Sequence, residues 1–514
     1  MLLLKNFKRL LELKSYIYGN LNFIIRLKAF NKKQFYVAIL LATLTVLFEG
    51  LGVSILIPLL NFIQVEGDLT KFQNSSLISL YVYKILTFLG IKVNMLILSL
   101  IAGTFVVLRQ TVNLFNLVMI QRITSGIHKS INQEMFSALM NSSQKNIIEL
   151  STGKFINATD IEPSYVASTM KGYFTIFTNI LTLIIYSVIL LLTAFIPTLI
   201  GVITLFLLVF FTGSRFAVMT KKISESNIAL RAKYRELITE RFLGWKTINI
   251  FNSLTNEEKK IKNILQKIYS NTVYLQQIQG TIQLIFVSIS TILILVTLNI
   301  LVGLFMLDAI AIIVFGIAFM RLTPTFKTFQ HHIVRLVELL PSYKFCEMIY
   351  LNAKKETFFD KGKIKKLNLK KEITFKNVSF KYSTKDNTIL KNITFNIKIG
   401  KINAIVGPSG SGKSTIVDLI SKILFPNKGK IYFDGHSILD INNNTLRDLI
   451  AYIPQEPFLF QDSIIDNIKY GSKNVKDSEV WKALSLVKLD KFIKKLPDSI
   501  NTKIGLLGQT LSGG

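Results

Sequence analysis

The chain has 514 residues, of which 50% are hydrophobic and only 18% carry a charge. Soluble domains carry about 25% charged residues, so this composition excludes a disordered chain and disfavours a wholly soluble one. The 61 Lys and Arg residues outnumber the 31 Asp and Glu residues, a balance that fits either a nucleic-acid binder or a membrane protein with basic cytoplasmic loops.

The apolar residues occur in long blocks, and a membrane-spanning helix needs about 20 mostly apolar residues. Six blocks meet this requirement. They are residues 35–63, 93–120, 173–195, 197–214, 280–303 and 305–325. Very short breaks separate the third block from the fourth and the fifth from the sixth. We therefore expect an all-α transmembrane domain of six helices over residues 1–340.

The basic residues are concentrated in the two long loops that follow the second and fourth blocks, whereas the opposite loops hold few. Because cytoplasmic loops are enriched in Lys and Arg, we expect both termini and the two long loops in the cytoplasm. The helical pattern of these loops predicts helices that continue out of the membrane. This topology accounts for much of the positive charge, so we expect the lipid bilayer as a partner and no nucleic acid.

Charged residues inside the apolar blocks include Glu49 in the first, Arg109 in the second and Arg321 in the sixth. The first two blocks run in opposite directions, so at 1.5 Å per residue Glu49 and Arg109 come within about one turn of the same depth. Buried charge in a membrane usually faces a cavity or a partner. One hypothesis is a cavity that attracts an anionic headgroup through the two arginines. The alternatives are a structural Glu49–Arg109 pair, or helix ends that place these residues nearer the membrane surface.

Apolar content falls after residue 340, and we expect a linker over residues 341–371. From residue 372 the pattern changes to short strands (ITFKNVSFKY, NITFNIKI and the buried KINAIVG). The segment GPSGSGKST follows, and an apolar-periodic helix begins directly after it. This order of strand, glycine-rich loop and helix is the context that a P-loop requires.

The P-loop residues suit a nucleotide phosphate. Glycines let the backbone approach the phosphates closely, and successive N–H groups at the helix start point at negative oxygens. Lys413 can reach the β- and γ-phosphates, and the Ser414 hydroxyl can bind Mg²⁺. We therefore predict ATP and Mg²⁺ as cofactors. The predicted cradle is Gly407, Pro408, Ser409, Gly410, Ser411, Gly412, Lys413, Ser414 and Thr415.

Further segments resemble the nucleotide-binding domain of ABC transporters. Tyr382 in VSFKYS matches the aromatic residue that stacks on adenine, and Gln455 in YIPQEPFLF matches the glutamine that contacts Mg²⁺ and the transport domain. The stretch GKIYFDG also matches, and LSGG at residues 511–514 matches the family signature. With six preceding spans, the chain resembles an exporter-type half-transporter: a six-helix transmembrane domain followed by an α/β P-loop domain over residues 372–514.

The resemblance implies a dimer with a second half-transporter, expected to be identical. In that family, the signature of one copy (here Ser512, Gly513 and Gly514) caps the ATP held by the P-loop of the other. Closure on ATP would give alternating access, transmitted by cytoplasmic helices near residues 125–135 and 236–250. The location would be a bacterial inner (plasma) membrane.

Two departures from the family pattern affect what can be expected. The sequence stops at Gly514, within the signature, so the domain is incomplete at its C-terminus and no catalytic residue can be named in it. We expect the natural protein to be longer and to hydrolyse ATP when full length. In addition, Leu506 stands where such exporters usually carry a glutamate that contacts the transmembrane loops.

The substrate is the least determined feature. The segments EGLGVSILIPLL and FMRLTPTF resemble flippases for lipid-linked oligosaccharides and polysaccharides, which favours export of a lipid-linked or amphipathic substrate. A multidrug or peptide exporter is one alternative. Another is a membrane partner or regulator that binds nucleotide without hydrolysing it.

Overall fold

The computed structural model describes residues 18–26, 30–143, 146–147, 150–193, 195–303, 309–355, 362–382, 388–455, 458–472 and 474–505. The chain divides into two compact units. Met1–Phe358 is helical throughout its regular structure, and Phe359–Gly514 contains the sheet.

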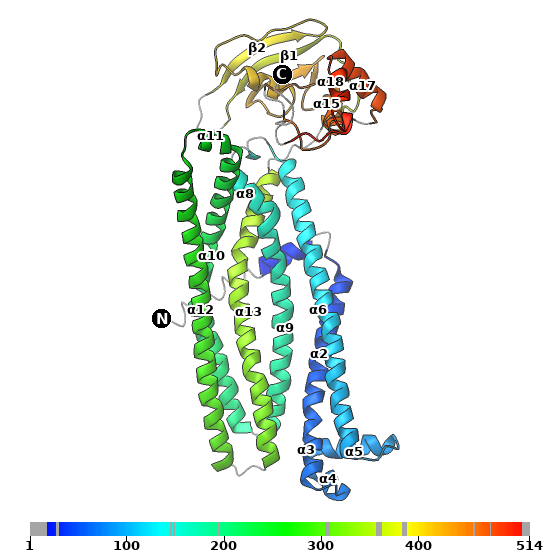
Figure 1. Cartoon of the computed structure of the whole chain (residues 1–514), viewed down its shortest axis with the longest axis vertical. Coiled ribbons are helices and arrows are strands. Elements are labelled where there is room, and N and C mark those ends of the chain that lie inside the picture. The colour runs from blue at the N-terminus through cyan, green and yellow to red at the C-terminus, as the bar shows by residue number, and fades with distance from the viewer. Residues whose placement is uncertain are drawn as a thin grey trace. The chain divides into compact units, whose positions relative to one another are not determined.

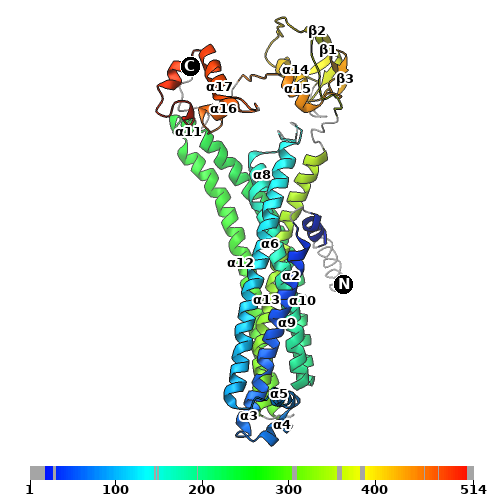
Figure 2. The same ribbon diagram turned by 90° about the vertical axis from the view of Figure 1, so that its right-hand side faces the viewer.

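The first unit consists of long helices that run side by side (Figure 1). Shorter helices join them at the ends of the bundle, as a second view shows (Figure 2). The helices are α2 (Lys32–Ser54), α3 (Leu56–Gln64), α4 (Leu69–Ser75), α5 (Leu77–Phe88), α6 (Met95–Met140), α8 (Thr152–Ile156), the π-helical η1 (Asn157–Ile161), α9 (Glu162–Thr193), α10 (Phe195–Leu243), α11 (Trp245–Ile250), α12 (Leu254–Gly303) and α13 (Ala309–Lys355).

Several of these helices are much longer than a membrane is thick. Helix α6 has 46 residues, which is about 70 Å at 1.5 Å per residue, against a hydrocarbon core of about 30 Å. Helices α10 and α12 have 49 and 50 residues. The long helices therefore have length to continue beyond a bilayer, as the pattern of the basic loops predicts.

Five stretches of the described residues are long and apolar enough to cross a membrane: Lys32–Gln64, Met95–Met140, Thr152–Leu191, Thr198–Leu243 and Leu254–Thr297. The expected count of six is therefore not reached. The block at residues 305–325 is not among these five, because it begins within residues 304–308, which lie outside the described residues. Residues 341–355, expected as linker, are the last turns of α13.

The first apolar block is interrupted between α2 and α3 at Ile55. Pro58 lies in the first turn of α3. A proline ring clashes with the carbonyl four residues earlier, and proline lacks an N–H for that carbonyl. The carbonyl concerned is that of Ser54, the last residue of α2, so Pro58 explains where the break falls.

Two apolar clusters hold the bundle together. One contains Ile127, Ile131, Met170 and Cys346 and joins α6, α9 and α13, with Ala38 from α2. The other joins α9, α10, α12 and α13 around fully buried aromatic side chains, among them Tyr186, Phe286, Phe315 and Phe326. Helices α9 and α13 belong to both clusters, so they form the common wall of the bundle.

The second unit contains a four-stranded antiparallel sheet in the order β2-β1-β3-β4. The strands are β1 (Glu372–Phe380), β2 (Leu390–Lys398), β3 (Lys428–Phe433) and β4 (His436–Ser437). Phe375 pairs with Phe395 across β1 and β2 and its ring stacks on that partner at 4.6 Å. The buried face of the sheet packs with Leu419 and Leu446 from two helices, α14 (Lys413–Ile420) and α15 (Asn443–Leu449).

The prediction of a buried strand at KINAIVG is wrong for this structure. Residues 402–407 have no strand geometry, and Ile402 and Val406 are exposed. A strand needs a neighbour to accept its backbone hydrogen bonds. Among the described residues no strand pairs with this segment, so its apolar pattern alone does not bury it.

A second apolar core of this unit lies among short helices. It contains Ile464, Val480, Leu484 and Ile493 from α16 (Ile464–Lys469), α17 (Asp477–Leu486) and α18 (Asp490–Lys494). Ile500 lies in the 3-10 helix η2 (Ser499–Asn501) and belongs to the same core.

Candidate functional site

The glycine-rich loop leads into α14 through backbone conformations that only glycine adopts easily. Gly410 and Gly412 have φ angles of +81° and +89°, and Gly412 is the N-cap of α14. A Cβ on Gly412 would lie 2.7 Å from Leu390 Cδ2, and one on Gly407 would lie 2.7 Å from Ser411 Oγ. The loop therefore needs glycine both for its left-handed turns and for the close approach of its neighbours.

Lys413 is folded back over this loop. Its ammonium donates to the carbonyl oxygens of Gly407 at 2.9 Å and Pro408 at 2.8 Å. The same ammonium stands at the N-terminus of α14, where unpaired N–H groups favour an anion. The arrangement fits the phosphates of ATP, whose oxygens would replace these weak carbonyl partners of a lysine.

Two of the other predicted nucleotide contacts are placed by the same elements. The Tyr382 hydroxyl lies 3.4 Å from Thr415 Oγ1, and its ring contacts Phe380 edge-on at 5.0 Å. Ser414 lies in the first turn of α14, where its hydroxyl is available to a hard cation such as Mg²⁺. Gln455 lies apart from these elements in sequence, in an exposed segment without helix or strand.

The helical unit contains a cavity of about 600 Å³ between α2, α6, α9 and α13. This volume lies within the range of small-molecule sites. The lining residues are Thr45, Val46, Glu49, Arg109, Asn113, Thr178, Asn179, Thr182, Ile317, Met320, Arg321, Pro324, Thr325 and Thr328. All three charged residues singled out in the apolar blocks therefore line one cavity.

Glu49 is the centre of the charged group. Arg109 Nη2 lies 3.0 Å from Glu49 Oε2, and the Tyr186 hydroxyl donates to Glu49 Oε1 at 3.2 Å. Arg321 Nη1 is 4.0 Å from Glu49 Oε1. The ion pair between Glu49 and Arg109 and the cavity thus exist together, and the two interpretations of these residues are not exclusive.

Family models match both halves of the chain. The model described as the ABC transporter transmembrane region matches residues 35–323, and the one described as ABC transporter matches residues 390–514. The chain belongs to the ABC transporter family. The members of this family are ATP-hydrolysing transporters, so the P-loop of the second unit is an ABC nucleotide-binding site and the first unit is the transmembrane region.

Similar proteins agree with this assignment. The chain is 26% identical over 410 residues to the heterocyst differentiation ATP-binding protein HepA of Nostoc sp., covering 79% of this chain and 67% of that protein. It is 46% identical over 143 residues to the mitochondrial iron-sulfur clusters transporter ATM1 of Candida albicans, covering 28% of this chain but 19% of that protein.

A solved structure of a bacterial Atm1-family ABC exporter with ATP bound superposes with a TM-score of 0.69 and 20% identity. The superposition covers 95% of this chain and 82% of the other. It shows the ABC exporter fold.

The signature residues of this ABC transporter, Ser512, Gly513 and Gly514, lie outside the described residues, as does Leu506. Sequence reasoning missed Tyr186 and Asn179, although a signal was present. Thr178, Thr182 and Tyr186 follow each other at four-residue spacing in a mostly apolar segment, which places them on one helix face.

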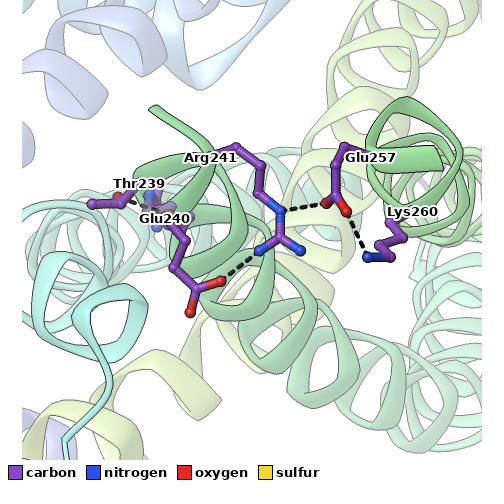
Figure 3. Close-up of polar contacts among 6 residues, drawn as sticks. Thr239, Glu240, Arg241, Glu257 and Lys260 are labelled. Carbon is purple, nitrogen blue, oxygen red and sulfur yellow. Dashed lines mark hydrogen bonds and ion pairs between the residues drawn. The ribbon is translucent and has the colours of Figure 1, made fainter. Parts of the chain in front are cut away.

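The region expected as a cytoplasmic helix near residues 236–250 forms a hairpin of α10, α11 and α12. Arg241 Nε donates to Glu257 Oε2 at 2.7 Å, and Lys260 Nζ donates to Glu257 Oε1 at 2.6 Å (Figure 3). These hydrogen bonds, the one from Lys260 foremost, lower the pKa of Glu257. The bridge joins the end of α10 to the start of α12, so it holds both ends of the intervening α11.

Proposed function

We propose that this ABC transporter hydrolyses ATP with Mg²⁺ and uses the energy to export a substrate across the membrane by alternating access in a dimer. The observation that carries this proposal is that one chain holds both a phosphate-binding P-loop at residues 407–415 and a charged cavity inside its transmembrane region. Members of the family couple two such sites. Ser414 and Gln455 would hold Mg²⁺, and Tyr382 would stack on the adenine.

We propose a dimer because half-transporters of this family pair two such units. The sequence given contains one P-loop and one signature, Ser512 to Gly514. In our proposal a second copy supplies the signature that completes each ATP site. A homodimer is the simplest arrangement because it needs no other gene product.

We propose α13 as the sixth span, with both termini in the cytoplasm of a bacterium and the transporter in its inner membrane. Helix α13 packs in one apolar core with α9, α10 and α12, which belong to three of the stretches that qualify as spans. The positive-inside distribution of the loops supports the orientation.

We propose that the substrate is an amphipathic or lipid-linked molecule, a lipid-linked oligosaccharide being one member of this class. The support is the cavity, which combines apolar walls with charged groups inside spanning segments. The relatives leave this choice open, because one is named for iron-sulfur clusters and another, from Entamoeba histolytica, for multidrug resistance.

The experiment uses the native protein reconstituted in liposomes with a fluorescent short-chain phosphatidic acid. We expect ATP-dependent movement of this lipid between leaflets and loss of the movement in Lys413→Ala. ATP hydrolysis that no lipid, drug or peptide stimulates would contradict transport. Nucleotide binding without any hydrolysis would favour the second candidate, a non-hydrolysing membrane partner.

A further inference from the structure

The two arginines of the cavity do not contact Glu49 equally. What we infer from this difference rests on the proposed export function. Glu49 is only 13% exposed and Arg109 27%, whereas Arg321 is 55% exposed. Arg109 forms the short ion pair at 3.0 Å, while Arg321 stands at 4.0 Å, the outer limit of an ion pair. Glu49 therefore has one close arginine and one loose arginine.

Removing Arg109 from Glu49 would be costly, because breaking an ion pair in a region of low dielectric leaves an uncompensated charge. Turning Arg321 away would cost little, since Oε1 of Glu49 keeps the hydrogen bond from Tyr186 at 3.2 Å. Two arginines and one carboxylate also give the group a net charge of +1. Arg321 carries that charge at the exposed side of the group.

The remaining hydrogen-bonding capacity of the cavity indicates what Arg321 would bind. Asn179 Nδ2 is buried in the wall and has no hydrogen-bond partner. The threonine hydroxyls cannot serve as donors to a ligand, because each already donates to a backbone carbonyl of its own helix. They are Thr45, Thr178, Thr182, Thr325 and Thr328. The donors that remain in the lining are thus guanidinium groups and the amides of Asn113 and Asn179, and of these two amides the buried Asn179 Nδ2 is the one without a partner.

The same cavity has an apolar wall. Val46, Ile317, Met320 and Pro324 line it beside the charged group. Guanidinium groups pair best with carboxylate or phosphate, and apolar walls favour an attached hydrocarbon chain.

We propose that Arg321, with Asn179, is the receptor for a phosphate-type anion on an amphipathic substrate. Arg109 is a positioning residue that holds Glu49 in place. Glu49 acts as the internal counter-ion that Arg321 leaves when the anion binds. The receptor exists only where α9 and α13 meet around the cavity, so neither helix forms it alone.

The test is equilibrium binding of radiolabelled dodecyl phosphate to the native protein in phosphatidylcholine nanodiscs, with empty nanodiscs subtracted. We expect Arg321→Gln to weaken binding about tenfold, the effect of losing one charged hydrogen bond, and Arg321→Lys to restore part of it. Lys327→Gln is the matched control, since it removes one positive charge from the same helix outside the cavity lining. Equal loss in both variants would overturn the proposal.

A double variant separates the two arginines. Glu49→Gln with Arg109→Gln removes the ion pair but keeps Arg321 and the net charge of the cavity. We expect its affinity for dodecyl phosphate to be at least the native value, because Arg321 remains and the carboxylate that competes with the anion for it is gone. A loss as large as that of Arg321→Gln, in protein whose thermal unfolding remains cooperative, would assign the receptor to Arg109 and overturn the proposal.

Competitors identify the source of the anion. Dodecyl maltoside and dodecyltrimethylammonium should not displace the label, and displacement by either would contradict an anion site. Displacement by inorganic phosphate at the same concentration as dodecyl phosphate would keep Arg321 as the receptor but contradict the amphipathic substrate. Binding of a fluorescent ATP analogue is measured in the same samples. Loss of ATP binding would contradict the proposed function, whereas ATP binding without dodecyl phosphate binding would contradict this inference alone.

Discussion

The two candidate sites of this transporter are built from different material. The P-loop of the nucleotide site is one continuous stretch, Gly407–Thr415, which is shaped by glycine backbone geometry and presents a single lysine. The cavity is made of side chains from four helices, and its charged group joins residues far apart in the chain. Backbone N–H groups cannot be exchanged by mutation, but side chains can.

This difference separates the energy source from the choice of substrate. A backbone-built phosphate cradle offers few positions at which its ligand could be changed, and most changes would abolish it. In the cavity a single substitution can alter charge or size while the helices keep their packing through the two apolar clusters. Substrate preference can therefore vary without loss of ATP use.

The largest expected effect is at the nucleotide site. Lys413→Ala removes the ammonium that faces the phosphates, and we expect ATP turnover of the native protein to fall at least about 100-fold. Lys401→Ala, an exposed lysine shortly before the loop, is the control and should retain turnover. Unfolding of the membrane region should be unchanged in both variants. Near-normal turnover in Lys413→Ala would refute the role of the P-loop.

The next effect tests the cavity. Arg109→Gln leaves Glu49 without its close partner, and we expect a loss of roughly 3 kcal/mol in the stability of the helical unit. Transport should fall more than basal ATP hydrolysis, because the nucleotide site is untouched. Thermal unfolding in nanodiscs and both activities are measured. Arg122→Gln, an exposed arginine further along α6, should change none of them.

An outcome in which Arg109→Gln alters neither stability nor transport would mean that the ion pair is dispensable. The charged group would then not be needed to keep the shape of the cavity.

A smaller effect tests why the P-loop requires glycine at particular positions. Gly412→Ala adds both a strained φ of +89° and a clash with Leu390, whereas Gly400→Ala adds a strained φ of +73° with open space around it. We expect Gly400→Ala to cost about 1 kcal/mol and Gly412→Ala about 1–3 kcal/mol more. Chemical denaturation of the second unit measures the difference, and equal costs would exclude the clash.

The sequence predicts the nucleotide site more fully than the cavity, for physical reasons. The P-loop is recognisable because its residues are neighbours in the chain and its conformation follows from local steric limits. The approach of Glu49 and Arg109 could be predicted from helix rise alone, because spans that run through the same layer share a depth scale. Rotation of the helices about their axes has no such local signal, so the contact of Tyr186 with Glu49 was not foreseen.

For the segment 402–407 the sequence predicts a structure that is not formed. Its apolar residues predict a buried strand, yet burial depends on neighbours that the local pattern cannot supply, and in the described residues it is exposed.

The smallest effect concerns a third site, the bridge of the α10–α12 hairpin, which resembles the cavity in being made of side chains but lies outside the spans. The hydrogen bonds from Lys260 and Arg241 hold the pKa of Glu257 below its usual value. The folded-state pKa is therefore lower than the unfolded one, so the bridge stabilises the hairpin above the unfolded pKa of about 4.3. That contribution is lost as the pH falls through the folded-state value.

Hydrogen exchange of peptides covering residues 241–257 measures this effect. Glu257→Gln should exchange faster than the native protein at neutral pH, because the ionic bridge is absent, and the two should converge once the native Glu257 is protonated. Comparing the proteins at each pH cancels the intrinsic pH dependence of exchange. Glu258→Gln changes the adjacent exposed carboxylate and should match the native protein throughout. If it behaves like Glu257→Gln, general charge on the hairpin, rather than the bridge to Arg241, controls the stability of this tip.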